Sequence, residues 1–173
     1  MPKGDQPFLS LAGEFAVASE LNRRHVLASV TYGASKCADV FALSPDMGRV
    51  IRIVVKATIP KRKTRWLIGA KGTIPADVRN AEVFWVLVLL PSPLDGVPVD
   101  QTQRGDHATR FFVLSPREVY EAWQKEYADF IERRGGRPFT GRGVPGVRLQ
   151  DVKGCEGQWG KILSRLQNSP NSK

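Results

Sequence analysis

The spacing of apolar residues predicts that the chain opens with an amphipathic helix. Between residues 8 and 24, apolar residues recur every three or four positions and form one face, made up of Phe8, Leu11, Phe15, Ala18 and Leu21. At about 100° per residue, Glu14 falls inside this face, whereas Glu20 points to the opposite side. A carboxylate directed at the core is costly unless it is paired or binds a cation. Glu14 is therefore either a functional residue or a helix-edge residue that reaches water or pairs with a nearby lysine.

The pattern after the helix predicts a β-hairpin. A short strand at residues 26–30 comes first, and the hairpin strands are expected at residues 39–43 and 50–57. The loop between them contains the turn-forming residue types Pro, Asp and Gly. If this loop is symmetric about its middle, the register places Asp39 opposite Lys56. The sequence thus predicts an acid and a lysine that face each other across the hairpin.

A continuous apolar run at residues 83–90 predicts a strand buried on both faces, at the centre of a sheet. Residues 110–114 predict a further strand. Ser115 and Pro116 then have the residue types that begin a helix. The aromatic stripe of this helix is a candidate for base stacking, but its helical spacing favours core packing; it comprises Val119, Trp123, Tyr127 and Phe130.

The remaining segments complete a single domain. Residues 133–146 are dense in Gly, Arg and Pro and predict a flexible basic loop, whereas residues 158–166 predict a closing helix. Residues 168–173 predict a disordered tail. We therefore expect one α/β domain at residues 1–167, with a central mixed β-sheet flanked by α-helices.

Charge narrows the expected partners. The formal net charge is +9, and the excess lies in two blocks. Residues 49–79 contain nine Lys or Arg and one acid, and residues 131–173 contain nine and three, whereas residues 80–130 contain four and eight. Concentrated positive charge attracts nucleic acids, because neutralising phosphates releases counterions. The alternatives are a basic surface that serves solubility and a basic surface that binds an acidic protein partner.

Compartment and redox state follow from what the sequence lacks. No apolar run approaches the roughly 20 residues that cross a bilayer, and no hydrophobic stretch follows the N-terminal residues. We therefore expect a cytoplasmic protein with no membrane partner. Cys37 and Cys155 are far apart in the chain and predict reduced thiols, not a disulfide framework.

The order of these elements, with Glu14, Asp39 and Lys56 at these places, resembles the PD-(D/E)xK, or restriction-endonuclease-like, nuclease superfamily. The resemblance covers most of residues 9–166 and is greatest to a branch of small uncharacterised bacterial proteins. Those proteins share a Gly-Glu helix, a Gly-x-x-Lys-x-x-Asp element, a strand ending in Val-Lys and a closing Trp-x-x-Ile/Leu helix. The matching segments here are Gly13-Glu14, Gly33-Ala34-Ser35-Lys36-Cys37-Ala38-Asp39, Val55-Lys56 and Trp159-Gly160-Lys161-Ile162.

The resemblance implies a restriction-endonuclease-like core and a divalent-metal-dependent endonuclease that hydrolyses DNA with Mg²⁺ or Mn²⁺. It implies that Asp39 is the principal metal ligand and that Glu14 is a second or water-mediated ligand. Lys56 would orient the nucleophilic water or stabilise the pentavalent phosphate. The DNA backbone would be held by Lys36, Lys61, Arg62, Lys63 and Arg65. Family members often act as homodimers, so a dimer is a further expectation.

One position departs from the family pattern. The family normally has Glu, Asp or Gln two residues before the lysine, and this chain has Val54, which cannot coordinate a metal. Asp46 and Asp106 are the acids that could substitute. The alternative function is therefore a catalytically silent nucleic-acid-binding module with the same fold.

Overall fold

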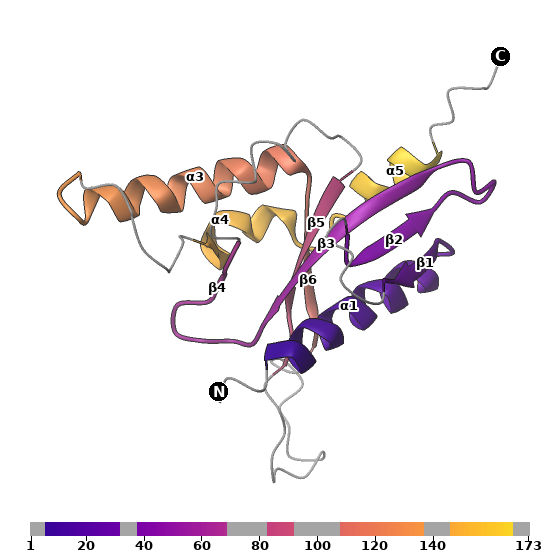
Figure 1. Cartoon of the computed structure of the whole chain (residues 1–173), viewed down its shortest axis with the longest axis horizontal. Coiled ribbons are helices and arrows are strands. Elements are labelled where there is room, and N and C mark those ends of the chain that lie inside the picture. The colour runs from indigo at the N-terminus through magenta and orange to yellow at the C-terminus, as the bar shows by residue number, and fades with distance from the viewer. Residues whose placement is uncertain (1–5, 32–37, 69–82, 92–107, 137–145, 168–173) are drawn as a thin grey trace, which may run out of the picture.

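The computed structural model describes residues 6–31, 38–68, 83–91, 108–136 and 146–167 of the 173-residue chain. Figure 1 shows the elements in chain order. They are α1 (Gln6–Arg23), β1 (Leu27–Val30), β2 (Val40–Leu43), β3 (Val50–Thr58), β4 (Arg65–Trp66), β5 (Val83–Leu89), β6 (Arg110–Leu114), α3 (Pro116–Glu132), β7 (Val147–Arg148), α4 (Leu149–Val152), a 3₁₀ turn (Lys153–Cys155) and α5 (Gly160–Gln167). The predicted tail at residues 168–173 lies outside the described residues.

The five main strands form one mixed sheet in the order β1-β2-β3-β5-β6. The β3 and β5 strands are parallel, and the other neighbouring strands are antiparallel. The short strands β4 and β7 form a separate two-stranded sheet. The expected α/β class, with a central mixed sheet flanked by helices, is thus confirmed.

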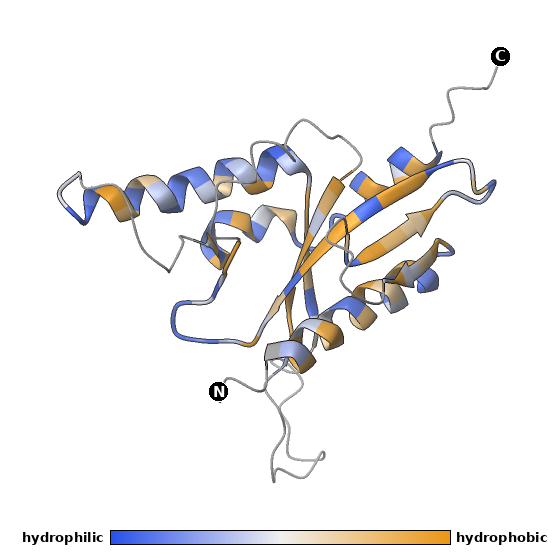
Figure 2. Ribbon diagram, in the orientation of Figure 1, coloured by the Kyte–Doolittle hydropathy of each residue, from blue (hydrophilic) through white to orange (hydrophobic). Residues whose placement is uncertain are grey.

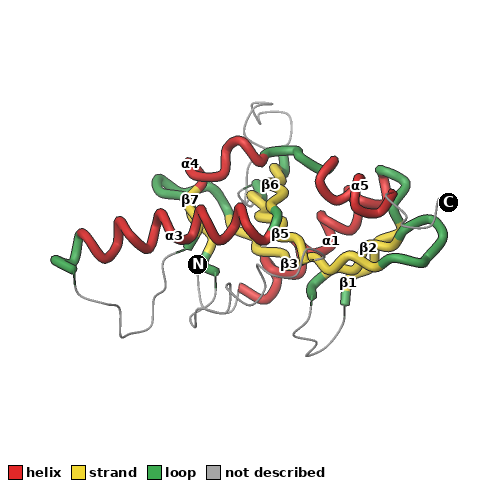
Figure 3. Tube along the Cα trace, turned by 90° about the horizontal axis from the view of Figure 1, so that it is seen from above, coloured by secondary structure: helices red, strands yellow, loops and turns green. Residues whose placement is uncertain are grey.

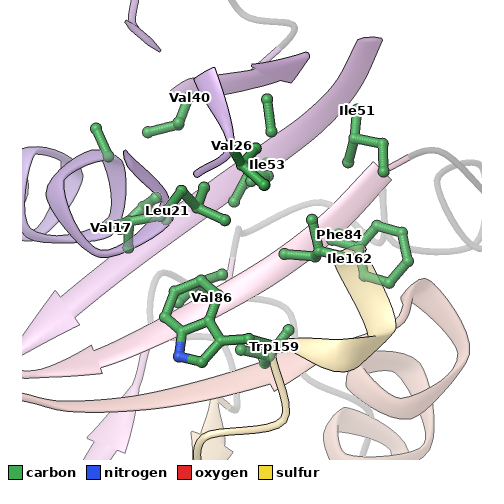
Figure 4. Packing of buried hydrophobic residues seen from close by; sticks show 14 of the residues in the cluster. Val17, Leu21, Val26, Val40, Ile51, Ile53, Phe84, Val86, Trp159 and Ile162 are labelled. Carbon is green, nitrogen blue, oxygen red and sulfur yellow. The ribbon is translucent and has the colours of Figure 1, made fainter. Parts of the chain in front are cut away.

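Alternation along the inner strands separates two hydrophobic layers. On β5, Phe84, Val86 and Val88 face α1 and α5, whereas the residues between them face α3 and α4. Figure 3 shows the sheet between these two pairs of helices, and Figure 2 shows its inner strands mostly in hydrophobic colours. Figure 4 shows Leu21 of α1 and Ile162 of α5 packed on the first of these layers. Every residue of β5 is buried, as its sequence predicts, although the middle strand of the sheet is β3.

The predicted apolar face of α1 is confirmed for Ala18 and Leu21, but the buried face is rotated by roughly a quarter of a turn from the predicted one. Phe8, Leu11 and Phe15 are 75%, 38% and 46% exposed, whereas Val17 and Leu21 are fully buried. The reason is the close approach of the helix to the sheet. A Cβ atom on Gly13 would lie 2.6 Å from the Cβ of Ala57 on β3. Only small residues fit at such a contact, so the bulky residues lie on the outer side.

The start of α3 agrees with the sequence. Ser115 is the N-cap, and Glu118 completes a capping box with it. Glu118 also accepts a hydrogen bond from Lys161 Nζ at 2.7 Å, which ties α5 to α3. The aromatic stripe is divided, because Val119 is fully buried while Trp123 is half-buried against the second hydrophobic layer. Core packing of its first two members is confirmed.

Among the described residues, no helix is both long enough and apolar enough to cross a membrane.

Candidate functional site

Asp39 lies immediately before β2, at the point where β2 and β3 separate. The predicted register is wrong by two residues, because Val40 pairs with Ile53 and Asp39 therefore does not stand opposite Lys56. The backbone N–H of Asp39 donates to Ile53 O at 2.9 Å, and the backbone N–H of Val55 donates to Asp39 Oδ2 at 2.7 Å. The carboxylate thus replaces a main-chain acceptor on the β2 side of β3. Oδ2 is fixed in the sheet, and among the described residues no hydrogen bond engages the other oxygen.

The register shift leaves Asp39 and Lys56 close to each other. A shift of two residues keeps each strand residue on the same face of the sheet, because side chains alternate with period two. Lys56 is half-buried and follows Val55, the residue that binds the Asp39 carboxylate. The acid and the lysine are therefore diagonal neighbours across the end of the hairpin.

Glu14 reaches the same place from α1. The buried arc of the helix contains Gly13, Val17, Ala18 and Leu21, and Glu14 lies within it. Burial raises the pKa of Glu14, the nearby Asp39 carboxylate raises that pKa further, and Lys56 lowers it. The three residues that the sequence singled out are therefore within electrostatic reach of one another. They come from a helix, a loop end and a strand.

The contact at Gly13 explains why Glu14 can reach the strands. Gly13 is buried against Ala57, the residue directly after Lys56. With no side chain between the helix and β3, the next residue of the helix lies close to the sheet. The adjacent pair Gly13-Glu14 therefore combines a close approach with a carboxylate.

Glu14→Gln should stabilise the folded protein at pH 7–8 in the absence of divalent cations. Because the pKa of Glu14 is raised in the folded state, the native protein binds more protons there than the unfolded chain does. Glu14 therefore disfavours folding increasingly as the pH rises through its folded pKa. The advantage of the glutamine should disappear below the unfolded value of 4.5. Urea unfolding from pH 4 to pH 8 with a chelator measures this difference.

The matched control is Glu20→Gln on the same helix. Glu20 forms ion pairs with Arg23 and Arg24, so its replacement should leave stability unchanged or lower it slightly. A Glu14→Gln protein that is less stable than the wild type at pH 7–8 would contradict the raised pKa.

Asp46 and Asp106 are the two acids that could replace the family acid missing at Val54, and the structure describes only Asp46. Asp46 lies in the turn at the far end of the hairpin, where it accepts hydrogen bonds from Ser44 Oγ and the backbone N–H of Gly48. These bonds lower its pKa and hold it in the turn. Asp106 and the predicted DNA contact Lys36 lie outside the described residues. Asp46 therefore does not contribute to the site.

The donor set at the site consists of two carboxylates. Within the described ranges, no group of three or more His, Cys, Asp or Glu side chains is placed to hold a metal ion. Carboxylate oxygens are the donors that Mg²⁺ and Mn²⁺ prefer, and Mg²⁺ is often held by one or two carboxylates with water completing the shell. Burial is the main cause of the raised pKa of Glu14, and the nearby Asp39 carboxylate adds to it. Glu14 and Asp39 therefore fit a divalent cation in chemical character.

The remaining predicted DNA contacts lie along a separate pocket. After β3 ends, Lys61, Arg62 and Lys63 are exposed in the loop that leads to Arg65 on β4. This loop borders a pocket of about 720 Å³, which we call the basic pocket. Among the described residues it is lined by Lys61, Arg62, Lys63, Thr64, Arg65, Glu126, Arg133, Arg148, Leu149, Gln150 and Lys153.

Sequence reasoning found one side of the basic pocket and missed the other. Arg133, Arg148 and Lys153 belong to the second basic block of the chain, which the charge count had identified. Pairing of β4 with β7 brings the two blocks together, with Arg65 opposite Arg148. These strands are only two residues long, too short to give a sequence pattern. The two basic blocks indicate that a cationic site exists, but only the pairing of β4 with β7 shows that both blocks line the same pocket.

The sequence matches no protein-family model and no curated protein.

Proposed function

We propose that this protein is a divalent-metal-dependent endonuclease that hydrolyses phosphodiester bonds of DNA, built on a restriction-endonuclease-like core. The observation that carries the proposal is that three elements bring Glu14, Asp39 and Lys56 near one another: the residue before Lys56 binds the Asp39 carboxylate, and Gly13 packs on the residue after Lys56. Two nearby carboxylates and a lysine are groups that can hold a divalent cation and stabilise the charge that develops in phosphodiester hydrolysis. The element order, with an opening helix followed by three antiparallel strands and a parallel fourth, supports the proposed core.

Each residue has a distinct role in this proposal. Asp39 and Glu14 would hold Mg²⁺ or Mn²⁺, which when bound supplies an activated water and charge stabilisation at the scissile phosphate. Asp39 offers the oxygen that Val55 does not engage. Lys56 holds a positive charge beside both acids and would bind the phosphate oxygens or orient the attacking water.

Basic residues beyond β3 would supply the affinity for DNA. Lys61, Arg62 and Lys63 are exposed and follow Lys56 within seven residues. Such residues bind the backbone without reading its sequence, and the resulting affinity falls steeply with salt. In this proposal, the basic residues after β3 bind DNA, and the residues at the end of the hairpin hydrolyse it.

A second candidate function is a nucleic-acid-binding module without hydrolytic activity. Val54 favours it, because this residue packs against the second hydrophobic layer and offers no oxygen. The two-carboxylate donor set is a further argument for it. This module would bind DNA with the same salt dependence but would neither bind the metal productively nor cleave.

Lys56→Ala separates these functions. In the nuclease, the wild type should nick supercoiled plasmid and cut single-stranded oligonucleotide with Mg²⁺ or Mn²⁺, and the variant should lose about 100-fold to 1,000-fold in rate, the effect of removing one electrostatic stabiliser. DNA affinity should change little, because one phosphate contact among several is a small share of binding. Plasmid nicking rates and fluorescence anisotropy give the two readouts.

The control for lost charge is Arg52→Ala, which removes one cation from the same face of β3. Its cleavage rate should stay near that of the wild type. If the wild type binds DNA but cleaves neither substrate with either metal, the proposed nuclease activity is contradicted and the binding module remains as the function.

A further inference from the structure

The basic pocket concentrates positive charge beyond what the hydrolytic site uses. Its described lining contains seven Lys or Arg residues and one acid, Glu126. The cations come from three segments: residues 61–65, the end of α3 with Arg133, and residues 148–153. Like charges repel, so a fold gathers them around one hollow at a cost that a bound anion relieves. The hollow is therefore a candidate anion site.

One arginine of the pocket is already neutralised. Arg148 donates from Nε to Asp151 Oδ2 at 2.6 Å and also binds Asp129 through a second nitrogen. Its Nε lies 3.0 Å from Glu126 Oε2 as well. This arginine is held by three acids and braces β7 against α3, so it contributes structure more than free charge.

Two other arginines, Arg65 and Arg133, keep most of their side-chain N–H donors available. Arg65 and Arg133 each approach Glu126 Oε1 at 3.8 Å, too far for a hydrogen bond, and their side chains are 52% and 63% exposed. A guanidinium group has five N–H donors in a planar fork. Arg133 also donates from Nε to Asp129 O at 3.0 Å. The remaining N–H donors of the two half-exposed guanidinium groups can meet a phosphate.

Glu126 holds these two arginines in place. Glu126 is 3% exposed, and its Oε2 accepts no hydrogen bond from the described residues. The Nε–H of Arg148, which lies near this oxygen, donates to Asp151 instead. A buried carboxylate without its hydrogen bonds attracts the nearest cations strongly. Glu126 is therefore a positioning residue that draws Arg65 and Arg133 from two segments to one edge of the pocket.

We propose that the basic pocket binds the terminal phosphate of a nucleic-acid strand, so that the protein engages strands with a phosphorylated end. This inference rests on the proposed function for the identity of the polymer. A terminal phosphate monoester carries a charge of about −1.5 to −2 at pH 7 and has three free oxygens, whereas a backbone diester carries one charge. Two forked arginines and neighbouring lysines match the former.

The shape of the site also favours a strand end. A volume of about 720 Å³ lies in the range of small-molecule pockets. A phosphate within a strand is flanked by nucleotides on both sides and contacts an open surface, whereas a terminal phosphate can enter a hollow. A pocket lined by cations from three segments of the chain therefore selects the end of a strand.

The test compares three single-stranded oligonucleotides of one sequence, carrying a 5′-phosphate, a 3′-phosphate or hydroxyls at both ends. Binding is measured by anisotropy in the presence of a chelator, so that cleavage plays no part. The wild type should bind a phosphorylated strand about 10-fold more tightly, as expected for one or two charge-assisted hydrogen bonds. Free deoxynucleoside monophosphate should compete with the phosphorylated strand, and the nucleoside should not.

Arg65→Ala combined with Arg133→Ala should remove the preference for a phosphorylated end. The matched control is Lys125→Ala, which removes an exposed cation next to Glu126 on α3 but outside the pocket lining; it should keep the preference. Thermal melting verifies that each variant is folded. Equal affinity of the wild type for all three strands, or a preference that survives the double substitution, overturns the proposal.

Failure of this proposal and failure of the nuclease are distinguishable. If the protein binds and cleaves DNA with no preference for phosphorylated ends, only the proposed role of the basic pocket is wrong. If the protein never cleaves DNA but prefers strands with a phosphorylated end, the proposed role of the basic pocket stands and only the proposed nuclease activity is wrong.

Discussion

Asp39→Asn should reduce metal-dependent DNA cleavage by more than about 100-fold, because even residues that only support a metal ligand cost 10-fold to 100-fold when removed. Asparagine retains an oxygen that can accept the hydrogen bond from the Val55 N–H, so the end of the hairpin stays intact. What the substitution removes is the negative charge. We also expect Mg²⁺ or Mn²⁺ to raise the melting temperature of the wild type, and this increase should be absent in Asp39→Asn.

Val54→Glu is the complementary change. Val54 follows Ile53, the partner of Val40, and therefore adjoins Asp39. A glutamate there would provide a third carboxylate, and cleavage should increase if the site lacks one ligand. Val54→Met controls for side-chain length without adding charge.

The outcomes of these two substitutions separate the functional alternatives. Cleavage by the wild type that vanishes in Asp39→Asn identifies a working nuclease. A silent wild type with activity gained in Val54→Glu identifies an inherited but disabled site. Activity that Asp39→Asn leaves unchanged would remove Asp39 from the hydrolytic site.

The second large effect concerns salt. Replacing Lys61, Arg62, Lys63 and Arg65 together by alanine should reduce the slope of log affinity against log salt by about 3 to 4, since each phosphate contact on duplex DNA contributes about 0.9. Over a fourfold change in salt concentration, that difference amounts to roughly 100-fold in affinity. Anisotropy titrations between 50 mM and 200 mM salt provide the measurement.

The control for this result must remove the same charge elsewhere. Four exposed cations that lie outside the basic pocket serve this purpose, namely Arg23, Arg24, Arg117 and Lys125. Their joint replacement by alanine lowers the net charge equally but should reduce the slope much less. If both quadruple variants lower the slope alike, binding depends on overall charge and not on the segment after β3.

The sequence predicts those parts of the fold whose pattern is local. The β5 strand has a continuous apolar run, and α3 begins at a Ser-Pro pair with a glutamate in its first turn; both are found as predicted. The position of β5 within the sheet was not predictable in the same way. Strand order depends on the pairing of β3 with β5, which are separated by 24 residues, and no local pattern specifies it.

The candidate site was predicted for a reason only partly correct. An apolar face centred near Leu11 and Phe15 predicts that Glu14 points inward, but those two residues are exposed. The buried face is centred nearer Val17, and Glu14 lies inside it all the same. Hydrophobicity alone identified the wrong stripe, because the sheet accepts only small residues at Gly13.

The contact between Gly13 and Ala57 sets the distance between the backbones of α1 and β3. Because no side chain separates α1 from β3 there, the separation between the Glu14 and Lys56 backbones does not vary with the size of the surrounding core residues. Substitutions elsewhere in the first hydrophobic layer can accumulate without changing the spacing of the charged groups. Substitutions in the interior of this domain therefore preserve the spacing between Glu14 and Lys56, provided that position 13 stays a glycine.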